Sequence, residues 1–436
     1  MRRARQQLLL LACSAPLRAC AQNFTAAVAV LEAAIVARVF PGCAAGVLSS
    51  DGRVLLSGGW GSQVYAGETA PLGGNAPADA SSLFDMASIT KIVGVTTATA
   101  LLLQRGELAS LDAPLASAAL LGPAFAGQGK AAITVRDCLL HRAGFPPDPV
   151  PGYWEAPFGC PATALQPHPP LNFSCAQRIL EAVQAQPLAY PPHSAWVYSD
   201  LSMISLAFAL GGLVRGRGLV PRAALRADCA AAGGGGGGDE GLSRLCHFEA
   251  YVRLEVLAPA GMADTGFLPA AARWTEAMPT YADPVYRHEI MQGAVSDENS
   301  YALGGVAGHA GLFASLRDML AFVRLWALRQ PPLLQRATRD LFLTAPDPDA
   351  SPRALGWATQ APTDDNRDCG DWPNATAYHT GYTGTLICVD TESNVSLVLL
   401  TTRVYPNKTA NADAIQIVRQ QFSSAVRAAL QRSARD

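Results

Sequence analysis

The sequence has few charges and very little lysine. Only 16% of its 436 residues are charged, the formal net charge is −2, and just three of the 33 basic residues are lysines, at positions 91, 130 and 408. Proteins that bind nucleic acids need clustered Lys and Arg to neutralise phosphates, and no extended basic patch occurs here. We therefore expect no nucleic-acid partner.

Long apolar runs are also absent after the N-terminal segment. A membrane-spanning helix needs about 20 consecutive apolar residues, and none of the later runs reaches that length. Half of the residues are nevertheless apolar, which is enough for the core of a globular protein of two closely joined subdomains. We expect a soluble mature protein without stable membrane insertion.

Two common hydrolase motifs are missing. No G-x-S-x-G occurs, so the nucleophile elbow of the α/β-hydrolases is not expected. The segment HEIMQ has Gln292 where a zinc-binding helix needs its second histidine. The cysteines do not have metal-site spacing either. We expect neither a metal nor an organic cofactor.

Residues 1–21 predict a signal peptide. A basic start precedes an apolar run from Leu8 to Leu17, and Ala19-Cys20-Ala21 resembles a small-residue cleavage site. An organelle transit peptide is the alternative, because arginines but no acidic residue precede Glu32. Five glycosylation sequons favour a secreted protein over one in an organelle lumen; they lie at Asn23, Asn172, Asn374, Asn394 and Asn407.

Removal of the predicted signal peptide, residues 1–21, leaves an even number of cysteines. Eight remain, at positions 43, 138, 160, 175, 229, 246, 369 and 388. An even number indicates disulfides in an oxidising compartment, although eight cysteines permit 105 pairings. Short intervening loops favour three pairs, namely Cys160 with Cys175, Cys229 with Cys246, and Cys369 with Cys388. Buried free thiols are the alternative.

Sheet-forming patterns lie at both ends of the chain. Residues 25–38 predict a helix, and residues 43–61 predict two strands joined by an Asp51-Gly52 turn. Residues 355–360, 377–390 and 395–402 predict further strands, and residues 410–432 a long amphipathic helix. The sequence pattern in the middle of the chain predicts mostly helices. It contains a Pro-rich loop and six consecutive glycines that predict a flexible insertion.

These patterns predict an α/β fold of the α+β type. One antiparallel sheet, built from both ends of the chain and flanked by helices, is joined to a mostly helical subdomain. We expect one domain over residues 22–430. Its sheet part covers about 25–95 and 290–430, and its helical part covers about 96–289, with the Gly-rich insertion at 229–246.

Ser88 and Lys91 are the first candidate catalytic residues. They lie three residues apart at the start of a predicted helix that closes at Gly106, so both side chains should share one helix face. The positive end of the helix would stabilise an anion and lower the pKa of the amine, which activates a serine without histidine. A chance pattern on a solvated face is the alternative, and the scarcity of lysine weakens it.

Two further polar segments are candidates for the same site. Tyr198, Ser199 and Asp200 precede an apolar helix, where a phenol near an ammonium could relay protons. Tyr198 could equally be a core aromatic, with Ser199 or Asp200 as the N-cap. The segment 378–384, YHTGYTG, lies on a predicted strand whose N–H groups could serve an oxyanion. A β-bulge with an ordinary half-buried His379 is the alternative.

Together, the order and spacing of S-x-x-K near 90, Y-S-D near 200 and H-T-G near 380 resemble the class C β-lactamase and penicillin-binding-protein-like serine hydrolases. The segments 133–148, 256–267 and 297–315 fit the same resemblance, which covers most of residues 25–430. It implies a β-lactamase/transpeptidase-like fold and an acyl-enzyme mechanism.

The resemblance also implies residue roles. Ser88 would attack a carbonyl, while Lys91 and Tyr198 would share general-base and general-acid duty. His379, Thr380 and Gly381 would line the substrate edge, and the backbone N–H groups of Ser88 and Tyr382 would form the oxyanion hole.

Two departures from the family pattern affect the expected substrate. Asp200 stands where many members have Asn, and His379 where many have Lys. An ionised carboxylate only accepts hydrogen bonds and His is mostly neutral at pH 7, so the positive charge that holds a β-lactam carboxylate is reduced. We expect an esterase or D-amino-acid peptidase-like enzyme with weak β-lactamase activity at most, acting on a small molecule or peptide.

A non-catalytic binding or scaffolding protein of the same fold is the alternative function. The two departures make it conceivable, while the joint presence of Ser88, Lys91 and Tyr198 disfavours it. His141 and His309 lie in Gly-rich loops and are interpreted as structural residues near the cleft, and Arg403 as a surface arginine rather than a carboxylate partner.

Overall fold

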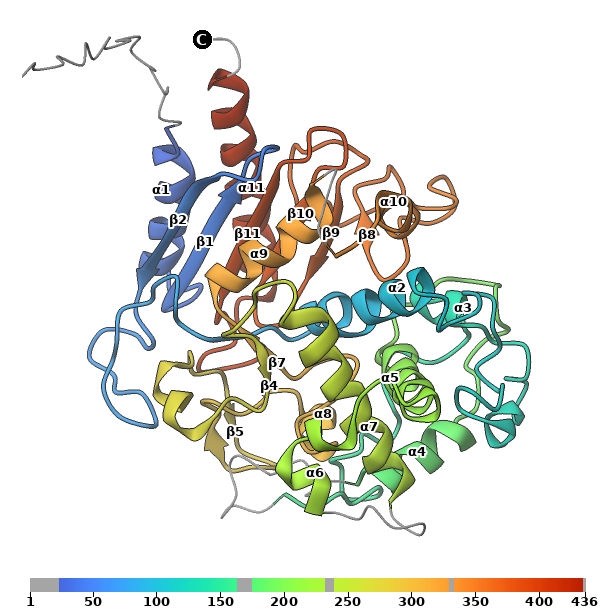
Figure 1. The fold of residues 1–436 in the computed structure, drawn as a ribbon. Helices are drawn as coiled ribbons and strands as arrows, with labels where there is room; N and C mark the ends of the chain where they lie inside the picture. Colours follow the sequence, from blue (N-terminus) through green and yellow to red (C-terminus); the bar gives the residue numbers. More distant parts are fainter. Residues whose placement is uncertain (1–22, 163–174, 232–238, 329–332, 434–436) are drawn as a thin grey trace, which may run out of the picture.

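The structure, a computed structural model, describes residues 23–162, 175–231, 239–328 and 333–433. Its centre is a six-stranded antiparallel sheet in the order β2-β1-β11-β10-β9-β8 (Figure 1). The strands are β1 (Gly42–Leu48), β2 (Val54–Gly61), β8 (Ala358–Thr359), β9 (Ala377–Thr380), β10 (Leu386–Val389) and β11 (Ser396–Thr401). The predicted sheet from both ends of the chain is confirmed.

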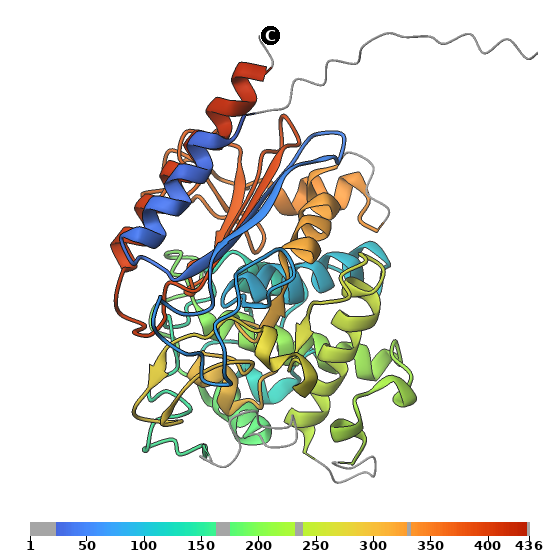
Figure 2. The same ribbon diagram turned by 90° about the vertical axis from the view of Figure 1, so that its left-hand side faces the viewer.

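Helices cover both faces of this sheet. The helices α1 (Thr25–Val36) and α11 (Ala412–Ser433) lie side by side on one face (Figure 2), and α9 (Leu316–Ala327) packs on the other against β1 and β11. Every residue of β1 is therefore buried, which explains its apolar run in an antiparallel sheet. The adjoining Asp51-Gly52 turn places Gly52 at φ 83°, a conformation that glycine adopts without strain.

Most of the remaining helices form a second body below the sheet in Figure 1. They are η1 (Lys91–Thr96), α2 (Thr97–Gln104), η2 (Pro123–Ala126), α3 (Val135–Leu139), α4 (Ala176–Ala185), α5 (Asp200–Arg217), η3 (Arg222–Ala224), α6 (Ala227–Ala231), α7 (Glu240–Tyr251), η4 (Val252–Leu257), η5 (Ala271–Glu276) and α8 (Glu298–Ala302). The helix α10 (Arg336–Leu343) packs against α2. Residues 201–214 of α5 are all buried, so this helix is the core of the helical part.

Short strands connect the two bodies. The strands β3 (Phe84–Asp85), β7 (Leu312–Ala314) and β4 (Gly266–Phe267) form a three-stranded sheet, and β5 (Ala282–Asp283) pairs with β6 (Glu289–Ile290). The strand β3 leads directly into the helical segment that begins with η1. The site residues near position 90 therefore lie where the two bodies meet.

Three disulfides occur among the described residues. They join Cys160 with Cys175, Cys229 with Cys246, and Cys369 with Cys388, so all three predicted pairs are confirmed. Cys43 and Cys138 are free and buried, as the alternative interpretation expected for some of the thiols. The predicted signal peptide and the six glycines lie outside the described residues.

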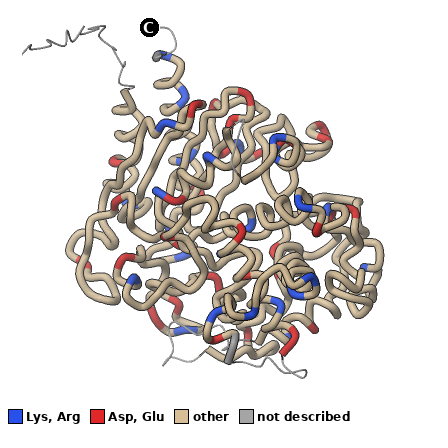
Figure 3. The backbone as a smooth tube through the Cα atoms, in the orientation of Figure 1, with Lys and Arg blue, Asp and Glu red and all other residues tan. Residues whose placement is uncertain are grey.

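Charged residues of both signs are interspersed along the part of the chain that the structure describes (Figure 3). Among the helices that the structure describes, none combines the length and apolar character needed to span a membrane.

Two local predictions need correction. The expected strand over 377–390 is divided into β9 and β10 by a turn at 381–385, where Gly384 has φ 103° and Gly381 N–H donates to Thr385 O. The helix after Ser88 is not uniformly α-helical, because Lys91–Thr96 is π-helical. Such π-bulges are frequent at functional sites.

Candidate active site

A strained turn presents Ser88 at the start of a helical segment. Ala87 has φ 44°, which costs a non-glycine residue energy that the surroundings must offset. The buried side chain of Asp85 supplies part of that support, because it accepts hydrogen bonds from the N–H groups of Ala87 (2.9 Å) and Ser296 (2.7 Å). Ser88 itself is partly exposed, so its hydroxyl can be reached from outside.

Lys91 is completely buried, and its ammonium group makes two hydrogen bonds and one ion pair. Its Nζ lies 2.8 Å from Ser88 Oγ, 2.8 Å from Asp200 Oδ1 and 3.1 Å from the carbonyl oxygen of His309. Burial alone would lower the pKa of Lys91, but Asp200 and Tyr198 outweigh it and raise that pKa above its ordinary value. The expectation of a lowered amine pKa is therefore wrong, and the resting lysine is charged.

Tyr198 and Asp200 are positioned by the start of α5. Ser199 is the N-cap, since its hydroxyl accepts from Ser202 N–H and donates to Pro146 O. The N–H of Asp200 donates to Pro147 O at 2.7 Å. This confirms the capping interpretation for Ser199 and leaves Asp200 available to Lys91.

The phenol of Tyr198 lies between the other polar groups. Lys91 Nζ is 4.9 Å from the centre of its ring, and the phenol interacts with both Lys91 and Ser88. Burial raises the pKa of Tyr198, although Lys91 counteracts part of that effect. Tyr198 is therefore a protonated phenol at neutral pH.

His379, on β9, is buried beside Tyr198. The two rings are 6.1 Å apart, and His379 Nδ1 is 2.8 Å from Thr380 O. Burial, together with the positive charges of Lys91 and Arg353, lowers the pKa of His379 to about 3. The imidazole is neutral at pH 7, in agreement with the reduced positive charge predicted for this position.

Gly381 allows the end of β9 to approach the Ser88 turn. A Cβ at this position would lie 2.6 Å from the carbonyl oxygen of Met86 and 2.1 Å from Thr385 Oγ1. The small residue is thus needed for contact with the protein's own chain, whereas the sequence suggested space for a ligand. Among the described residues, the N–H groups of Ser88 and Tyr382 donate to no protein acceptor, so both are available to an oxyanion.

A cavity of about 370 Å³ unites these groups. Ser88, Tyr198, His379, Thr380, Gly381 and Tyr382 all line it. Lys91 and Asp200 connect to it through their contacts with Ser88 and with each other. The structure therefore brings together all eight residues that the sequence singled out.

Asp297 was assigned no role from the sequence, and His141 and His309 were interpreted only as structural residues near the cleft. Asp297 accepts a hydrogen bond from His309 Nε2 at 2.8 Å, and this pair holds the loop whose carbonyl binds Lys91. His141 accepts from Ser199 N–H, and its ring lies 4.7 Å from that of Tyr198. Only their place in the Gly-rich segments pointed to them.

Two arginines at the cavity also differ from expectation. Arg353, which no sequence motif marks, lines the cavity and lies over the Tyr198 ring at 5.2 Å. Arg403 lines the cavity too, but it is buried, so its interpretation as a surface residue is wrong. Its guanidinium donates to the carbonyl oxygens of Tyr382, Lys408 and Ala410.

One set of potential metal ligands lies in the described part of the chain. Asp200, Asp297 and His309 each offer an atom within 4.8 Å of the others. Asp200 already binds the Lys91 ammonium, and Asp297 and His309 bind each other. Because these charges already compensate one another, the arrangement does not favour a metal ion.

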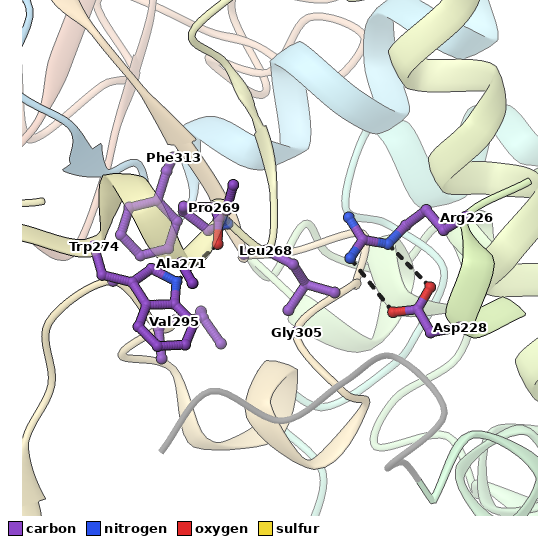
Figure 4. A pocket seen from close by; sticks show the side chains of 13 residues that line it. Arg226, Asp228, Leu268, Pro269, Ala271, Trp274, Val295, Gly305 and Phe313 are labelled. Carbon is purple, nitrogen blue, oxygen red and sulfur yellow. Dashed lines mark hydrogen bonds and ion pairs between the residues drawn. The ribbon is translucent and has the colours of Figure 1, made fainter. Parts of the chain in front are cut away.

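A separate cavity of about 260 Å³ has no such chemistry (Figure 4). Its lining includes Leu268, Val295 and Phe313, and an Arg226–Asp228 ion pair lies at one side. No serine, lysine or histidine lines it among the described residues. The cavity at Ser88 is therefore the candidate active site.

Comparison with known proteins agrees with this geometry. The family model for Beta-lactamase matches residues 21–220 and 239–422. A protein of Escherichia coli K12 named "Putative D-alanyl-D-alanine carboxypeptidase" is 26% identical over 82% of this chain and 77% of its own length. The N-acetylmuramyl-L-alanine amidase of Bacillus subtilis 168 is 28% identical over 84% of this chain and 78% of its own length.

Solved structures show the same fold. EstCE1, a hydrolase with promiscuous acyltransferase activity, superposes with a TM-score of 0.65 at 18% identity, over 93% of this chain and 99% of its own. A class C β-lactamase from Rhodobacter sphaeroides gives a TM-score of 0.61 at 18% identity, with the same coverage. The chain thus has the β-lactamase/transpeptidase-like fold, and it belongs to the Beta-lactamase family as a serine hydrolase.

Proposed function

We propose that the protein hydrolyses an ester or amide through an acyl-enzyme on Ser88. The observation that carries the proposal is the 2.8 Å contact between Ser88 Oγ and Lys91 Nζ inside a cavity that Tyr198 also lines. The unused N–H groups of Ser88 and Tyr382 support an oxyanion hole at the same place.

Asp200 explains how a charged lysine can act as a base. Lys91 Nζ and Asp200 Oδ1 form an ion pair at 2.8 Å, so a proton can pass from the ammonium to the carboxylate and leave a neutral amine and a neutral carboxylic acid. The amine then accepts the hydroxyl proton of Ser88. An asparagine at position 200 could not accept that proton.

The complete cycle balances with these groups. Ser88 Oγ forms a bond to the substrate carbonyl carbon, and the negative oxygen is bound by the N–H groups of Ser88 and Tyr382. The bond to the leaving group then breaks as Tyr198 donates its proton to the departing nitrogen or oxygen. Lys91 reprotonates Tyr198 and recovers its own proton from Asp200. In deacylation a water molecule takes the place of the leaving group, and the same steps run in reverse. Tyr198 accepts a proton from the water, Lys91 returns a proton to Ser88 Oγ, and the acid is released.

The substrate class follows from the charge at His379. A neutral imidazole cannot hold a β-lactam carboxylate as an ammonium would, and the pKa of His379 is lowered to about 3. We therefore propose esterase or D-amino-acid peptidase-like activity, with at most weak β-lactamase activity. These proposed activities are supported by the relatives named as a carboxypeptidase and an amidase, and by the fold shared with the hydrolase EstCE1. The complete set of interacting groups disfavours a non-catalytic scaffold.

The compartment is part of the proposal. Three disulfides among the described residues support an oxidising environment, and we propose that the protein is secreted. Glycosylation is proposed for the exposed sequons only, because Asn394 is just 5% exposed.

A fluorophosphonate probe tests the proposed function. We expect one adduct on the peptide that carries Ser88, and turnover of a chromogenic short-chain ester that the Ser88→Ala variant lacks. If the wild type and Ser88→Ala hydrolyse the ester equally slowly and fluorophosphonate labels neither, the protein is instead a non-catalytic scaffold.

A further inference from the structure

His141 binds the chain on both sides of Tyr198. Its carbonyl oxygen accepts a hydrogen bond from Val197 N–H at 2.8 Å, and its side-chain Nδ1 accepts one from Ser199 N–H at 3.1 Å. The residues immediately before and after the phenol of the proposed mechanism are therefore attached to the same histidine. The backbone of Tyr198 is thus fixed relative to His141.

The imidazole of His141 also packs on the side chain of Tyr198. The two ring centres are 4.7 Å apart and the ring planes are inclined by 37°, whereas the ring of His379 lies farther from Tyr198, at 6.1 Å. His141 is only 1% exposed, so close packing leaves it no room to move aside. Its ring therefore restricts the rotation of the phenol and, with it, the position of the hydroxyl group.

His141 is too isolated to transfer protons itself. Because Nδ1 accepts a hydrogen bond, the proton of the neutral imidazole resides on Nε2, which is buried without a hydrogen-bond partner among the described residues. Burial, together with the charges of Arg353 and Lys91, lowers the pKa of His141 far below its ordinary value, so the ring stays neutral at pH 7. His141 is also not one of the described residues that line the cavity at Ser88. Any effect on the reaction therefore passes through Tyr198.

The backbone conformation at His141 is one that glycine adopts more readily. The residue follows Leu140, the C-cap of α3, and has φ 54°. This left-handed position after a helix is commonly occupied by Gly or Asn, and another residue there has a conformational cost that the surroundings must offset. The contacts of the imidazole with Ser199 and Tyr198 account for a histidine at this strained position.

We propose that His141 is a positioning residue for Tyr198, which holds the phenol where it gives its proton to the leaving group and later accepts one from water. The proposal rests on the proposed acyl-enzyme function, and it goes beyond the structural role that the sequence suggested for His141. Catalytic side chains need to be held within about 0.5 Å of their productive position. The hydroxyl group lies at the far end of the tyrosine side chain, so small rotations of an unsupported ring exceed this limit.

Two esters of the same acid distinguish this role from a purely structural one. A nitrophenyl ester releases an acidic phenol that leaves without a proton, whereas the corresponding ethyl ester releases an alcohol that needs the proton of Tyr198. In His141→Ala we expect kcat/KM, which reports acylation, to fall by about 100-fold for the ethyl ester but by less than about threefold for the nitrophenyl ester. Fluorophosphonate should label Ser88 within about threefold of the wild-type rate, because fluoride also leaves without a proton.

The nitrophenyl ester provides a second measure. Deacylation needs Tyr198 to accept a proton from water, so kcat for this ester should fall by about 30-fold in His141→Ala, and KM should fall with it. The acyl-enzyme should then accumulate and produce an initial burst of nitrophenol. A smaller amount of folded protein does not produce this pattern, because it lowers kcat and kcat/KM by the same factor.

His141→Asn is the conservative variant. Asparagine tolerates the left-handed conformation, and its Oδ1 occupies the place of the histidine Nδ1, so it can accept from Ser199 N–H while the ring packing is lost. We expect it to slow the ethyl ester by about tenfold and the nitrophenyl ester by less than about threefold, which keeps the proposal testable if His141→Ala does not fold. His288→Ala is the matched control, since His288 also has a left-handed backbone, at φ 56°, but is exposed. It should leave the kinetics of both esters at the wild-type values.

Comparison with Tyr198→Phe completes the test. This variant should show the same preference for the nitrophenyl ester, and adding His141→Ala to it should slow the ethyl ester no further, because both changes remove the same step. A further loss in the double variant, or an equal effect of the His141 variants on both esters, would overturn the proposal. Failure of the proposed function itself looks different, because the wild type would then hydrolyse neither ester and fluorophosphonate would not label Ser88.

Discussion

Lys91 and Asp200 form an ion pair at the base of the active-site cavity, with Nζ 2.8 Å from Oδ1 and the lysine fully buried. An ion pair in this position has two consequences. It keeps the lysine charged in the resting enzyme, because Asp200 raises the pKa of Lys91 against the effect of burial. It also places a proton acceptor next to the group that must become a base.

Asp200→Asn should therefore change the pH dependence of catalysis. The amide cannot accept a proton, so Lys91 must lose its proton to solvent before it can act. We expect kcat at pH 7 to fall by about 100-fold, within the usual range for general-base effects. Loss of the carboxylate also lowers the pKa of Lys91, so activity should recover as the pH rises towards 9. If kcat of Asp200→Asn is lower by the same factor at every pH, so that the pH–rate profile does not move to higher pH, proton transfer from Lys91 to Asp200 is contradicted.

Asp297→Asn tests the second charged pair at the site. The asparagine oxygen can still accept from His309 Nε2 and from Ser300 N–H, as Asp297 does, so the change removes the charge and keeps the shape. Burial would lower the pKa of His309, but Asp297 raises it above its ordinary value. We expect Asp297→Asn to lower the stability at pH 7 by about 1–3 kcal/mol, as for other charged hydrogen bonds.

The sign of its pH dependence follows from the raised pKa. Stabilisation by His309 is fully present below the unfolded pKa of histidine, about 6.5, and is lost as the pH rises through the higher pKa of the folded state. Urea unfolding of the wild type and of Asp297→Asn should therefore show a difference in the free energy of unfolding that is smaller at pH 10 than at pH 6. Since His309 also holds the carbonyl that binds Lys91, kcat should fall about tenfold, with KM unchanged.

Gly381→Ala should misplace the nucleophile. The added Cβ would lie 2.6 Å from Met86 O, a backbone atom two residues before Ser88, so β9 and the Ser88 turn must move apart. A displacement of about 1 Å can reduce the rate about 100-fold, and we expect that loss in kcat/KM. Gly216→Ala is the control, because a Cβ at this exposed position of α5 meets nothing. Equal activity of the two variants would show that the close approach is not needed.

The predictions that succeeded depend on short-range relations in the chain. Ser88, in the turn before the helical segment, and Lys91, within that segment, meet because they are only three residues apart, and the Asp51-Gly52 turn is specified by its own two residues. The three disulfides join cysteines separated by short loops. Such features are fixed by local geometry, so the sequence alone suffices to predict them.

The features that were missed depend on contacts between distant segments. The charge of Lys91 is set by burial and by Asp200 on α5, and neither follows from the S-x-x-K motif itself. Arg353 lies in a segment without a recognisable pattern, and only the fold brings it to Tyr198. Arg403 was interpreted as a surface arginine, but it is buried and donates to the carbonyl oxygens of Lys408 and Ala410, which only the fold brings to it.

The Cys369–Cys388 disulfide should stabilise the sheet without taking part in catalysis. Cys388 lies on β10 within the apolar cluster beneath α1 and α11, which is the face of the sheet away from α9. The two cysteines are 19 residues apart, and closing a loop of this length is worth about 3 kcal/mol in the chain-entropy account. Urea unfolding of the double Ala variant should show this loss, while fluorophosphonate labelling of Ser88 stays at the wild-type level below the unfolding transition. The double variant should be insensitive to a reductant at this site, and an unfolding midpoint equal to that of the oxidised wild type would refute the stabilising role.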